Sequence, residues 1–335
     1  MRVLVGLPTF NNSASGYTIR RTLGALANQS YRDFRVLVVY KPSPGDETLD
    51  VVDEFSDKLD IEVRIQSDGF VEEAMNEIFK AATDYDITLT TDDDAIPTKT
   101  WIQDHLQLHR NHEKIGIVSG ITSQGGCYDP YRTIRQVLGY YKPLINELIN
   151  YYAIINDIGL WACNPKYLDA IKNYGWIYSL DIGGNNMSFK SGSLIDGFAL
   201  PGYTKRGGHY ERILALYFIR QRLHSAKFNG GFVKHLERDS LSRPKTETSK
   251  FMVDLENYLL PYGVYYYGFK INLDKLKLYK QLVKFLQYIE GRIKLLQGYV
   301  VGLSLAIEAI ENKYKPSEVR RRLLEIEQYI EMKYK

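Results

Sequence analysis

Apolar runs and helical patterns alternate over the first 120 residues of the chain. Short runs rich in β-branched residues, of the kind typical of buried strands, cover 3–7, 34–39, 61–65, 87–91 and 115–120. The stretches at 17–28 and 72–82 repeat apolar residues at helical spacing instead. Strands that alternate with helices predict an α/β fold with a doubly wound, mostly parallel sheet.

Polar loops follow four of these predicted strands, and they cover 8–12, 40–46, 67–69 and 92–94. Ligands of doubly wound sheets bind beyond the carboxyl ends of the strands, because the loops diverge there and helix N-termini point at the cleft. We therefore expect the functional site to be built from these loops.

The loop at 92–94 is a run of three aspartates that closes the fourth predicted strand. Side chains alternate along an extended chain, so Asp92 and Asp94 project to the same side and can face one cation. Mg²⁺ and Mn²⁺ prefer oxygen ligands and often complete their shell with substrate phosphates. A solvated acidic turn is the alternative, but the strand-end position favours a cation site for a nucleotide diphosphate. A calcium loop of the helix-loop-helix type is excluded, because Pro97 and Gln103 stand where it needs Gly and Glu.

The chain changes character along its length. Residues 121–268 are rich in aromatic residues and glycine and have poor periodicity, whereas continuous helical patterns begin at about 269. We expect a domain over 1–268, made of a nucleotide-binding half at 1–120 and an acceptor half at 121–268, and a helical region over 269–335. In the first helix of that region one face collects the apolar residues Leu278, Leu282, Phe285, Leu286, Ile289, Ile293 and Leu296.

Charge and cysteine content exclude several classes of protein. The formal net charge is +3, from 43 basic and 40 acidic residues, which is too small to indicate nucleic acid as a partner. Cys127 and Cys163 are too few for a disulfide framework and lack the spacing of a metal site, so we expect a cytoplasmic protein. The N-terminus does not resemble a signal sequence, and no segment reaches the ~18 uninterrupted apolar residues that span a bilayer. Any membrane contact would be peripheral, at the inner face.

The C-terminal residues 271–335 carry 13 Lys or Arg against 8 Asp or Glu. Amphipathic helices with this bias can lie on an anionic membrane, where a lipid-linked acceptor would be found. A helical cap or a homodimer surface is the alternative.

Three histidines, His105, His109 and His112, fall on one face of the helix predicted after the aspartates. Steps of four and three residues suit a zinc site, but no acid or thiolate at fixed spacing supports one. An exposed helix face is the alternative.

Several motifs occur in a fixed order in the first half of the chain. They are Pro-Thr-Phe-Asn at 8–11, Thr-Leu at 22–23, Asn-Gln-Ser-Tyr at 28–31, Gly69, Ala-Met-Asn at 74–76, the aspartates at 92–94, Pro97 and Trp101. In this order the chain resembles the inverting, Asp-X-Asp type glycosyltransferases of family 2, which have the GT-A fold. The resemblance extends more loosely to about residue 244. It implies a nucleoside-diphosphate sugar donor, of UDP or GDP type, and Mn²⁺ or Mg²⁺ as cofactor.

The resemblance also implies roles for single positions. Asp92 and Asp94 match the metal pair, with Asp93 between them at the donor, and His235 matches a late histidine that completes the metal shell. Gly183 and Gly184 match a segment whose backbone amides approach the donor. We expect Arg243 and Arg238, which follow His235, to close over the diphosphate. The other implied donor-binding residues are Pro8, Thr9, Asn11, Tyr40, Asp68, Gly69 and Asn76.

Two stretches depart from the family pattern. The family has an acidic pair before a helix, whereas this chain has Tyr210 and Glu211. Glu211 matches the second acid and is the candidate base, with Asp181 and His209 in reserve. Its alternative role is a favourable charge near a helix N-terminus, worth only ~0.3–1 kcal/mol. The family also has two aspartates after the second strand, whereas this chain has Tyr-Lys at 40–41, which leaves Asp46 or Asp68 to recognise the nucleotide.

The expected function is a single in-line displacement that transfers a sugar to a hydroxyl of a glycan, lipid-linked or protein-linked acceptor. A catalytically silent glycan-binding or scaffold protein is one alternative, suggested by the altered positions 40–41 and 210. A sugar-phosphate nucleotidyltransferase is the other, although its usual glycine-rich basic loop is absent from 8–12.

Overall fold

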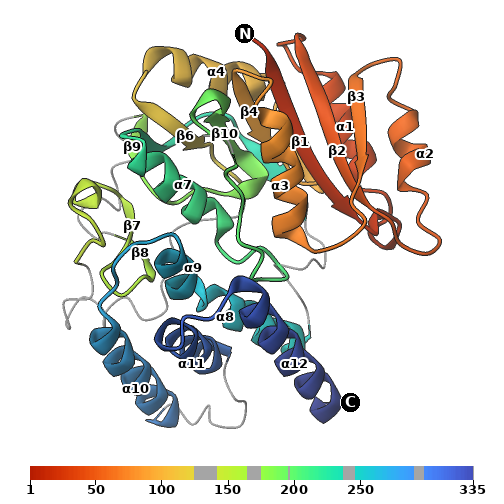
Figure 1. Cartoon of the computed structure of the whole chain (residues 1–335). Helices are drawn as coiled ribbons and strands as arrows, with labels where there is room; N and C mark the ends of the chain where they lie inside the picture. The colour runs from red at the N-terminus through yellow and green to blue at the C-terminus, as the bar shows by residue number, and fades with distance from the viewer. Residues whose placement is uncertain (124–141, 164–174, 195–196, 237–245, 290–297, 335) are drawn as a thin grey trace.

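In the computed structural model, the described residues are 1–123, 142–163, 175–194, 197–236, 246–289 and 298–334. A twisted sheet forms one end of the molecule, and helices from the last third of the chain extend away from it (Figure 1). The site lies on loops of this sheet, so the sheet is described first.

The central sheet has eight strands in the order β3-β2-β1-β4-β10-β6-β11-β9. β10 runs antiparallel to both its neighbours and β9 antiparallel to β11, whereas the other pairings are parallel. This confirms the predicted α/β fold with a mostly parallel sheet. The bounds are β1 Val3–Phe10, β2 Phe34–Lys41, β3 Asp60–Ile65, β4 Ile87–Thr90, β6 Ile115–Ser119, β9 Trp176–Tyr178, β10 Met187–Lys190 and β11 His224–Phe228.

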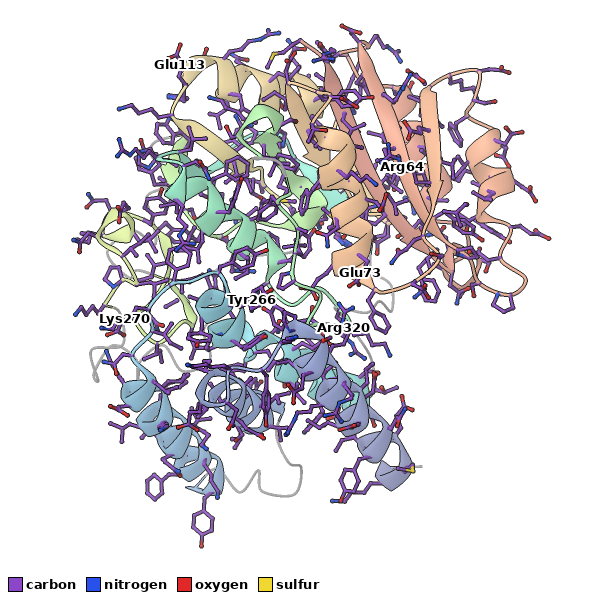
Figure 2. All side chains as sticks on the ribbon, in the orientation of Figure 1. Arg64, Glu73, Glu113, Tyr266, Lys270 and Arg320 are labelled. Atoms are coloured by element: carbon purple, nitrogen blue, oxygen red, sulfur yellow. The ribbon has the colours of Figure 1, made fainter. Side chains whose placement is uncertain are left out.

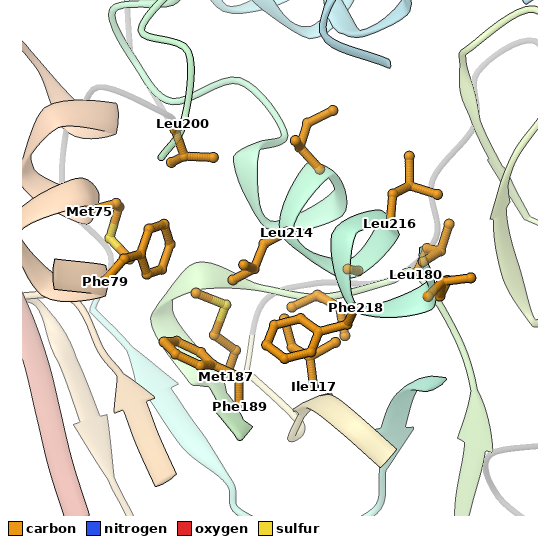
Figure 3. Close-up of a cluster of buried hydrophobic side chains, with 14 of the residues drawn as sticks. Met75, Phe79, Ile117, Leu180, Met187, Phe189, Leu200, Leu214, Leu216 and Phe218 are labelled. Carbon is orange, nitrogen blue, oxygen red and sulfur yellow. The ribbon is translucent and has the colours of Figure 1, made fainter. Parts of the chain in front are cut away.

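Helices cover both faces of this sheet, because the side chains of its strands alternate. In β1, Val3, Val5 and Leu7 pack on the side of α1 (Ile19–Ala27), α2 (Thr48–Asp53) and α4 (Trp101–Asn111). Leu4 packs on the opposite side, with α3 (Val71–Ala82) and α7 (Tyr210–Arg220). Figure 3 shows this second core, in which side chains of α3, α7 and β10 meet over the sheet.

Gly6 of β1 lets α3 approach the sheet closely, because a Cβ at this position would lie 2.6 Å from a side-chain carbon of Ile78. We expect Gly6→Ala to lower the free energy of unfolding by about 1–3 kcal/mol through overpacking. Gly192→Ala is the matched control, since nothing lies within 4 Å of a Cβ there. Urea unfolding of both variants checks this, and equal stabilities would contradict the close-packing argument.

A short two-stranded sheet lies at the carboxyl edge of the main one. β5 (Ala95–Pro97) pairs antiparallel with β12 (Val233–His235), and His235 stands opposite Ala95. This pairing brings a residue from far along the chain to the aspartates that precede β5. A second small sheet, β7 (Ala153–Ile155) with β8 (Trp161–Cys163), lies beside α7 (Figure 1).

The last third of the described chain is helical, as expected. Leu255 and Tyr262 of the first two helices share a buried cluster with Ala306 and Leu323 of the later ones, so the helical packing unit begins near residue 247. The helices are α8 Glu247–Asn257, α9 Leu260–Tyr266, α10 Leu273–Ile289, α11 Gly298–Glu311 and α12 Pro316–Tyr334.

The apolar face predicted for α10 is not the buried one. Leu276, Tyr279 and Val283 are buried, whereas Leu278 is 65% exposed and Phe285 is 57% exposed. α10 therefore has two apolar stripes, and periodicity alone does not tell which of them meets α11.

Buried and partly buried ion pairs join the helical region to α3. Glu72 accepts hydrogen bonds from the amide and hydroxyl of Thr204 at 2.6 and 2.8 Å. Arg320 of α12 pairs with Glu73 at 2.6 Å and with Glu72 at 3.3 Å, and Figure 2 shows Glu73 and Arg320 facing each other across this junction. Arg206 likewise bridges Glu256 of α8 and Glu327 of α12.

Burial raises the pKa of Glu72 to about 7, although the hydrogen bonds from Thr204 and the charge of Arg320 oppose this rise. A carboxyl that holds its proton more tightly in the folded state stabilises the fold below its unfolded pKa of 4.5. That contribution disappears as pH rises to 7, and it corresponds to about 3 kcal/mol. We expect Glu72→Gln to flatten the fall in unfolding free energy between pH 4.5 and pH 7, whereas the exposed Glu147→Gln keeps it. Urea unfolding across this pH range tests the difference.

Two features of the structure bear on the expected compartment. Within the described residues, no helix is long and apolar enough to cross a membrane. Cys163 is buried and disulfide-bonded, and the expected cytoplasmic compartment stays a prediction.

Candidate active site

The three aspartates after β4 divide into two kinds. Asp93 is 6% exposed, and its Oδ2 accepts hydrogen bonds from Thr9 Oγ1 at 2.7 Å and Asn12 Nδ2 at 2.6 Å. Asn12 also accepts the amide of Ile19 at the start of α1. Asp93, predicted at the donor, thus ties the acidic loop to the end of β1. Thr9, also predicted to bind the donor, takes part in this attachment through its hydrogen bond to Asp93.

Asp92 and Asp94 lie on the other side of the loop, with His235. Nε2 of His235 lies 3.3 Å from Asp94 Oδ1 and 3.4 Å from Asp92 Oδ2. One ligand atom from each of the three residues lies within 4.8 Å of the others, which suits a metal ion. The Asp94 side chain is 3% exposed and that of Asp92 is 42% exposed, so the cluster opens to solvent on the Asp92 side.

The surroundings of His235 favour a ligating tautomer. Its Nδ1 lies 3.3 Å from the carbonyl oxygen of Leu236, which can only accept a hydrogen bond. With Nδ1 donating to this carbonyl, Nε2 would be left to bind a cation held between the two carboxylates. Two carboxylates and one imidazole fit a divalent ion, and the nitrogen ligand favours Mn²⁺ over Mg²⁺.

Gly183 and Gly184 lie beside the end of β4, as the sequence implied. The carbonyl of Gly184 accepts a hydrogen bond from Thr90 Oγ1 at 2.6 Å. A Cβ on Gly184 would lie 2.1 Å from the Tyr210 hydroxyl oxygen, so any larger residue here would have to displace the Tyr210 side chain. The same contact places Tyr210, which replaces the family's first acid, against the glycine segment.

A buried polar network, missed in the sequence, fixes this segment to α4. Asn186, two residues after Gly184, accepts from Trp101 Nε1 at 2.8 Å and lies 3.0 Å from His105 Nε2. Ser188 Oγ lies between His105 Nδ1 and His109 Nε2, at 2.7 and 2.9 Å. Burial lowers the pKa of His105 to about 3 and that of His109 to about 4, so both rings are neutral.

The two roles predicted for these histidines, a zinc site and an exposed helix face, are both wrong. The nitrogens that zinc would need are hydrogen-bonded, and His105 and His109 are buried instead of exposed. His112 packs its ring on Trp176 at 4.6 Å. The helical spacing was seen in the sequence, but it did not tell which side of α4 faces the sheet.

Glu211 lies in the first turn of α7, and its side chain is 16% exposed. Its Oε2 is buried and has no hydrogen-bond partner within the described residues, while Oε1 lies 3.7 Å from Arg212. Burial raises the pKa of Glu211, Asp92 and Asp181 raise it further, and Arg212 opposes the rise. A desolvated carboxylate close to the acidic loop is a suitable proton acceptor.

The two alternative candidates for the base, Asp181 and His209, each bind a neighbouring cationic side chain. Asp181 forms an ion pair and hydrogen bond with Lys227. His209 has a left-handed backbone, with φ of 62°, and its Nδ1 accepts from Arg212. Burial lowers the pKa of His209 well below its usual value, and Arg212 adds to this effect.

The ends of β1 and β2 form the other part of the carboxyl edge. Asn11, just after β1, has a left-handed φ of 47°. The Tyr40 hydroxyl donates to the Asp46 carbonyl at 3.3 Å. Lys41 donates to the Gly69 carbonyl at 2.5 Å, and its Nζ lies 5.6 Å from the centre of the exposed Phe10 ring. Pro8, partly buried, belongs to β1 itself.

Asn76 and Asp68, also predicted to bind the donor, lie on α3 and in the loop after β3. Asn76 uses its amide oxygen and nitrogen to bind the backbone of Leu200, at 2.7 and 3.0 Å, so it joins α3 to that segment. Asp68 is exposed on the loop after β3. Arg243, with Arg238, lies outside the described residues.

Three solved structures of similar fold contain a nucleotide or a nucleotide sugar. The mannosyltransferase PcManGT from Pyrobaculum calidifontis, in complex with GDP-Man and Mn²⁺, has a TM-score of 0.53 and 16% identity over 98% of this chain and 84% of its own. GalNAc-T7 with UDP, GalNAc and Mn²⁺ has a TM-score of 0.53 and 12% identity over 71% of this chain and 43% of its own. TarS 1-349 of S. aureus, with UDP-GlcNAc, has a TM-score of 0.48 and 14% identity over 93% and 92%. This chain spans 39% of the longer TarS chain.

Sheet order and the likeness to PcManGT and GalNAc-T7 define the GT-A fold. Among curated protein sequences no match was found. The family model described as glycosyl transferase family 2 matches residues 4–172. The chain therefore belongs to glycosyl transferase family 2.

Proposed function

We propose that this chain is a metal-dependent, inverting glycosyltransferase that uses a nucleoside-diphosphate sugar. The observation that carries the proposal is the cluster of Asp92, Asp94 and His235 at the carboxyl edge of the sheet, with the buried carboxylate of Glu211 close enough to interact with Asp92. Cation ligands and a desolvated base beside one another are what this transfer requires.

Asp92, Asp94 and His235 would hold the divalent ion. When bound, such an ion offsets negative charge on the diphosphate leaving group. Asp93 keeps the loop in place through Thr9 and Asn12, so that its neighbours present their oxygens outward. We infer that Asp93 and Thr9 position the site and that Asp92 contacts the donor.

The nucleotide would lie over the ends of β1 and β2. Asp46 supports this placement, because its buried Oδ2 has no hydrogen-bond partner within the described residues. Its Oδ1 accepts from Ser13 and Thr48, which fixes the carboxylate. An N–H of a uracil or guanine base, or a ribose hydroxyl, would pair the remaining oxygen. We propose that Asp46 takes the place of the family aspartates that Tyr40 and Lys41 replace.

The reaction is one displacement at the anomeric carbon of the donor sugar. The acceptor oxygen forms a bond to that carbon while the bond to the diphosphate oxygen breaks, so the configuration inverts. Glu211 takes the proton of the acceptor hydroxyl, and the electron pair of the broken bond leaves with the nucleoside diphosphate. The acceptor is a hydroxyl of a glycan, a lipid-linked or a protein-linked molecule.

One experiment tests the proposal against its rivals. The chain is incubated with UDP, GDP, CDP and dTDP, each with and without Mn²⁺, and then with the matching sugar nucleotides and simple glycoside acceptors. We expect thermal stabilisation that needs both Mn²⁺ and one nucleotide, since ligands of the native state raise apparent stability, and release of that nucleoside diphosphate. Release of pyrophosphate would indicate a nucleotidyltransferase. Binding without turnover of any donor would indicate a silent binding protein.

A further inference from the structure

The outer face of α10 is apolar although nothing in the described structure covers it. Leu278, Phe285 and Tyr288 are 65%, 57% and 69% exposed. Leu278 and Phe285 are seven residues apart and share one face, with the partly buried Leu282 between them. Helices of folded proteins seldom leave such a stripe in water without a binding role.

A second exposed apolar group lies at the same end of the helical region. Lys277 of α10 pairs with Glu311 of α11 at 2.5 Å, and Arg322 of α12 pairs with Glu308 at 2.7 Å. The start of α10 and the start of α12 thus both lie beside the end of α11, so α10 and α12 run in the same direction. Their C-terminal ends point away from the sheet (Figure 1). Near the end of α12, Tyr329 is 54% exposed and Met332 is 73% exposed.

Basic side chains accompany the stripe on α10. The helix carries Lys275, Lys277, Lys280 and Lys284 against one acid, Asp274. Lys275 pairs with Asp157 and Lys277 with Glu311. Lys280 and Lys284 form no ion pair within the described residues. By helical geometry Lys284 lies next to Tyr288 at the edge of the apolar stripe, and the partly exposed Lys280 lies beyond Lys284 on the same side, toward the buried face. Exposed aromatic and aliphatic side chains flanked by unpaired lysines are the composition of helices that lie in the interface of an anionic bilayer.

Charge argues for a lipid surface over a second copy of this chain. A symmetric contact through α10 would bring Lys280 and Lys284 of two copies together with Asp274 as the one acid of each helix, which leaves an excess of positive charge on both copies. Anionic headgroups would balance them, while Phe285 and Tyr288 enter the boundary between headgroups and acyl chains.

We propose that the face formed by Leu278, Phe285 and Tyr288, with Lys280 and Lys284 on its flank, binds an anionic lipid bilayer. The end of α12 lies at the same pole and adds Tyr329 and Met332. This surface is separate from the metal cluster, and the proposal does not rest on glycosyl transfer. It would hold the enzyme at a membrane while the site on the sheet stays in water.

Vesicle flotation tests this surface. The whole chain is mixed with vesicles of zwitterionic phospholipid alone or with added anionic phospholipid. We expect binding to the anionic vesicles only, weakened by salt. The variant Leu278→Ser/Phe285→Ser/Tyr288→Ser should bind at least about tenfold more weakly. Lys280→Gln/Lys284→Gln should bind about 30-fold more weakly, from the known contribution of each lysine near an anionic surface.

Matched controls carry the same changes on other surfaces. Val63→Ser/Ile65→Ser removes exposed apolar side chains from the edge strand β3, and Lys58→Gln/Lys114→Gln removes two exposed lysines elsewhere. These variants should bind like the wild type, and all should unfold at similar temperatures. Failure of the wild type to bind anionic vesicles, or equal binding by the serine variant, would overturn the proposal. The proposal would also be overturned if the wild type sedimented as a dimer without binding vesicles, and only the serine variant abolished that dimer.

Discussion

Asp94→Asn is expected to lower the rate of sugar transfer by about 10²–10³-fold, because a neutral amide replaces a charged oxygen ligand of the catalytic ion. The Asp94 side chain is 3% exposed and lies 3.3 Å from His235 Nε2. Because it is enclosed by the protein, water has little access to replace its oxygen as a ligand of the ion. Asparagine has nearly the same shape, and we expect the fold to remain. Initial rates at saturating donor measure the loss, and the stabilisation by Mn²⁺ plus nucleoside diphosphate should fall with it.

Asp84→Asn provides the matched control. Asp84 is exposed in the turn before β4, at the end of this strand opposite the acidic loop, so the same chemical change there should leave transfer and metal response intact. If Asp94→Asn kept wild-type activity and metal response, the cluster with His235 would not be the catalytic metal site.

The sheet could be predicted from sequence because its information is local. A run of residues such as Val3 to Leu7 carries apolar side chains on both faces, and only a strand between two helical layers needs that pattern. The acidic pair follows from the same period of two: Asp92 and Asp94 share one side. That period also requires Asp93 to face the opposite way, which the structure shows in its bonds to Thr9 and Asn12.

Features that depend on distant packing were less visible. His235 reaches the acids only because β12 pairs with β5, and no local pattern contains that pairing; its role was implied by the family resemblance alone. The sequence did not show which side of α4 and of α10 is buried, and the reason is the same for both helices. Each helix has residues of a suitable kind on two sides, and the partner surface decides which side is buried. The missing hydrogen-bond partner of Glu211 Oε2 likewise exists only in the folded chain.

Glu211→Gln is expected to lower the rate of transfer by about 10²–10⁴-fold, the usual contribution of a general base. Glutamine cannot accept the acceptor's proton, but it keeps the size of the side chain, so binding of the donor with Mn²⁺ should be unchanged. Thermal stability should rise, because the folded state no longer holds a buried carboxylate whose pKa is raised by burial and by Asp92 and Asp181. Loss of activity together with a gain in stability distinguishes a base from a residue that only supports the fold.

Two further variants complete this test. Glu113→Gln alters an exposed glutamate in the turn after α4, and both its activity and its melting temperature should match the wild type. Asp181→Asn removes the carboxylate paired with Lys227, and we expect it to retain more activity than Glu211→Gln. The opposite order, with Glu211→Gln active and Asp181→Asn inactive, would transfer the role of base to Asp181. In that case the charge of Glu211 at the start of α7 would serve only its interaction with the helix N-terminus, and its replacement would lower stability instead of raising it.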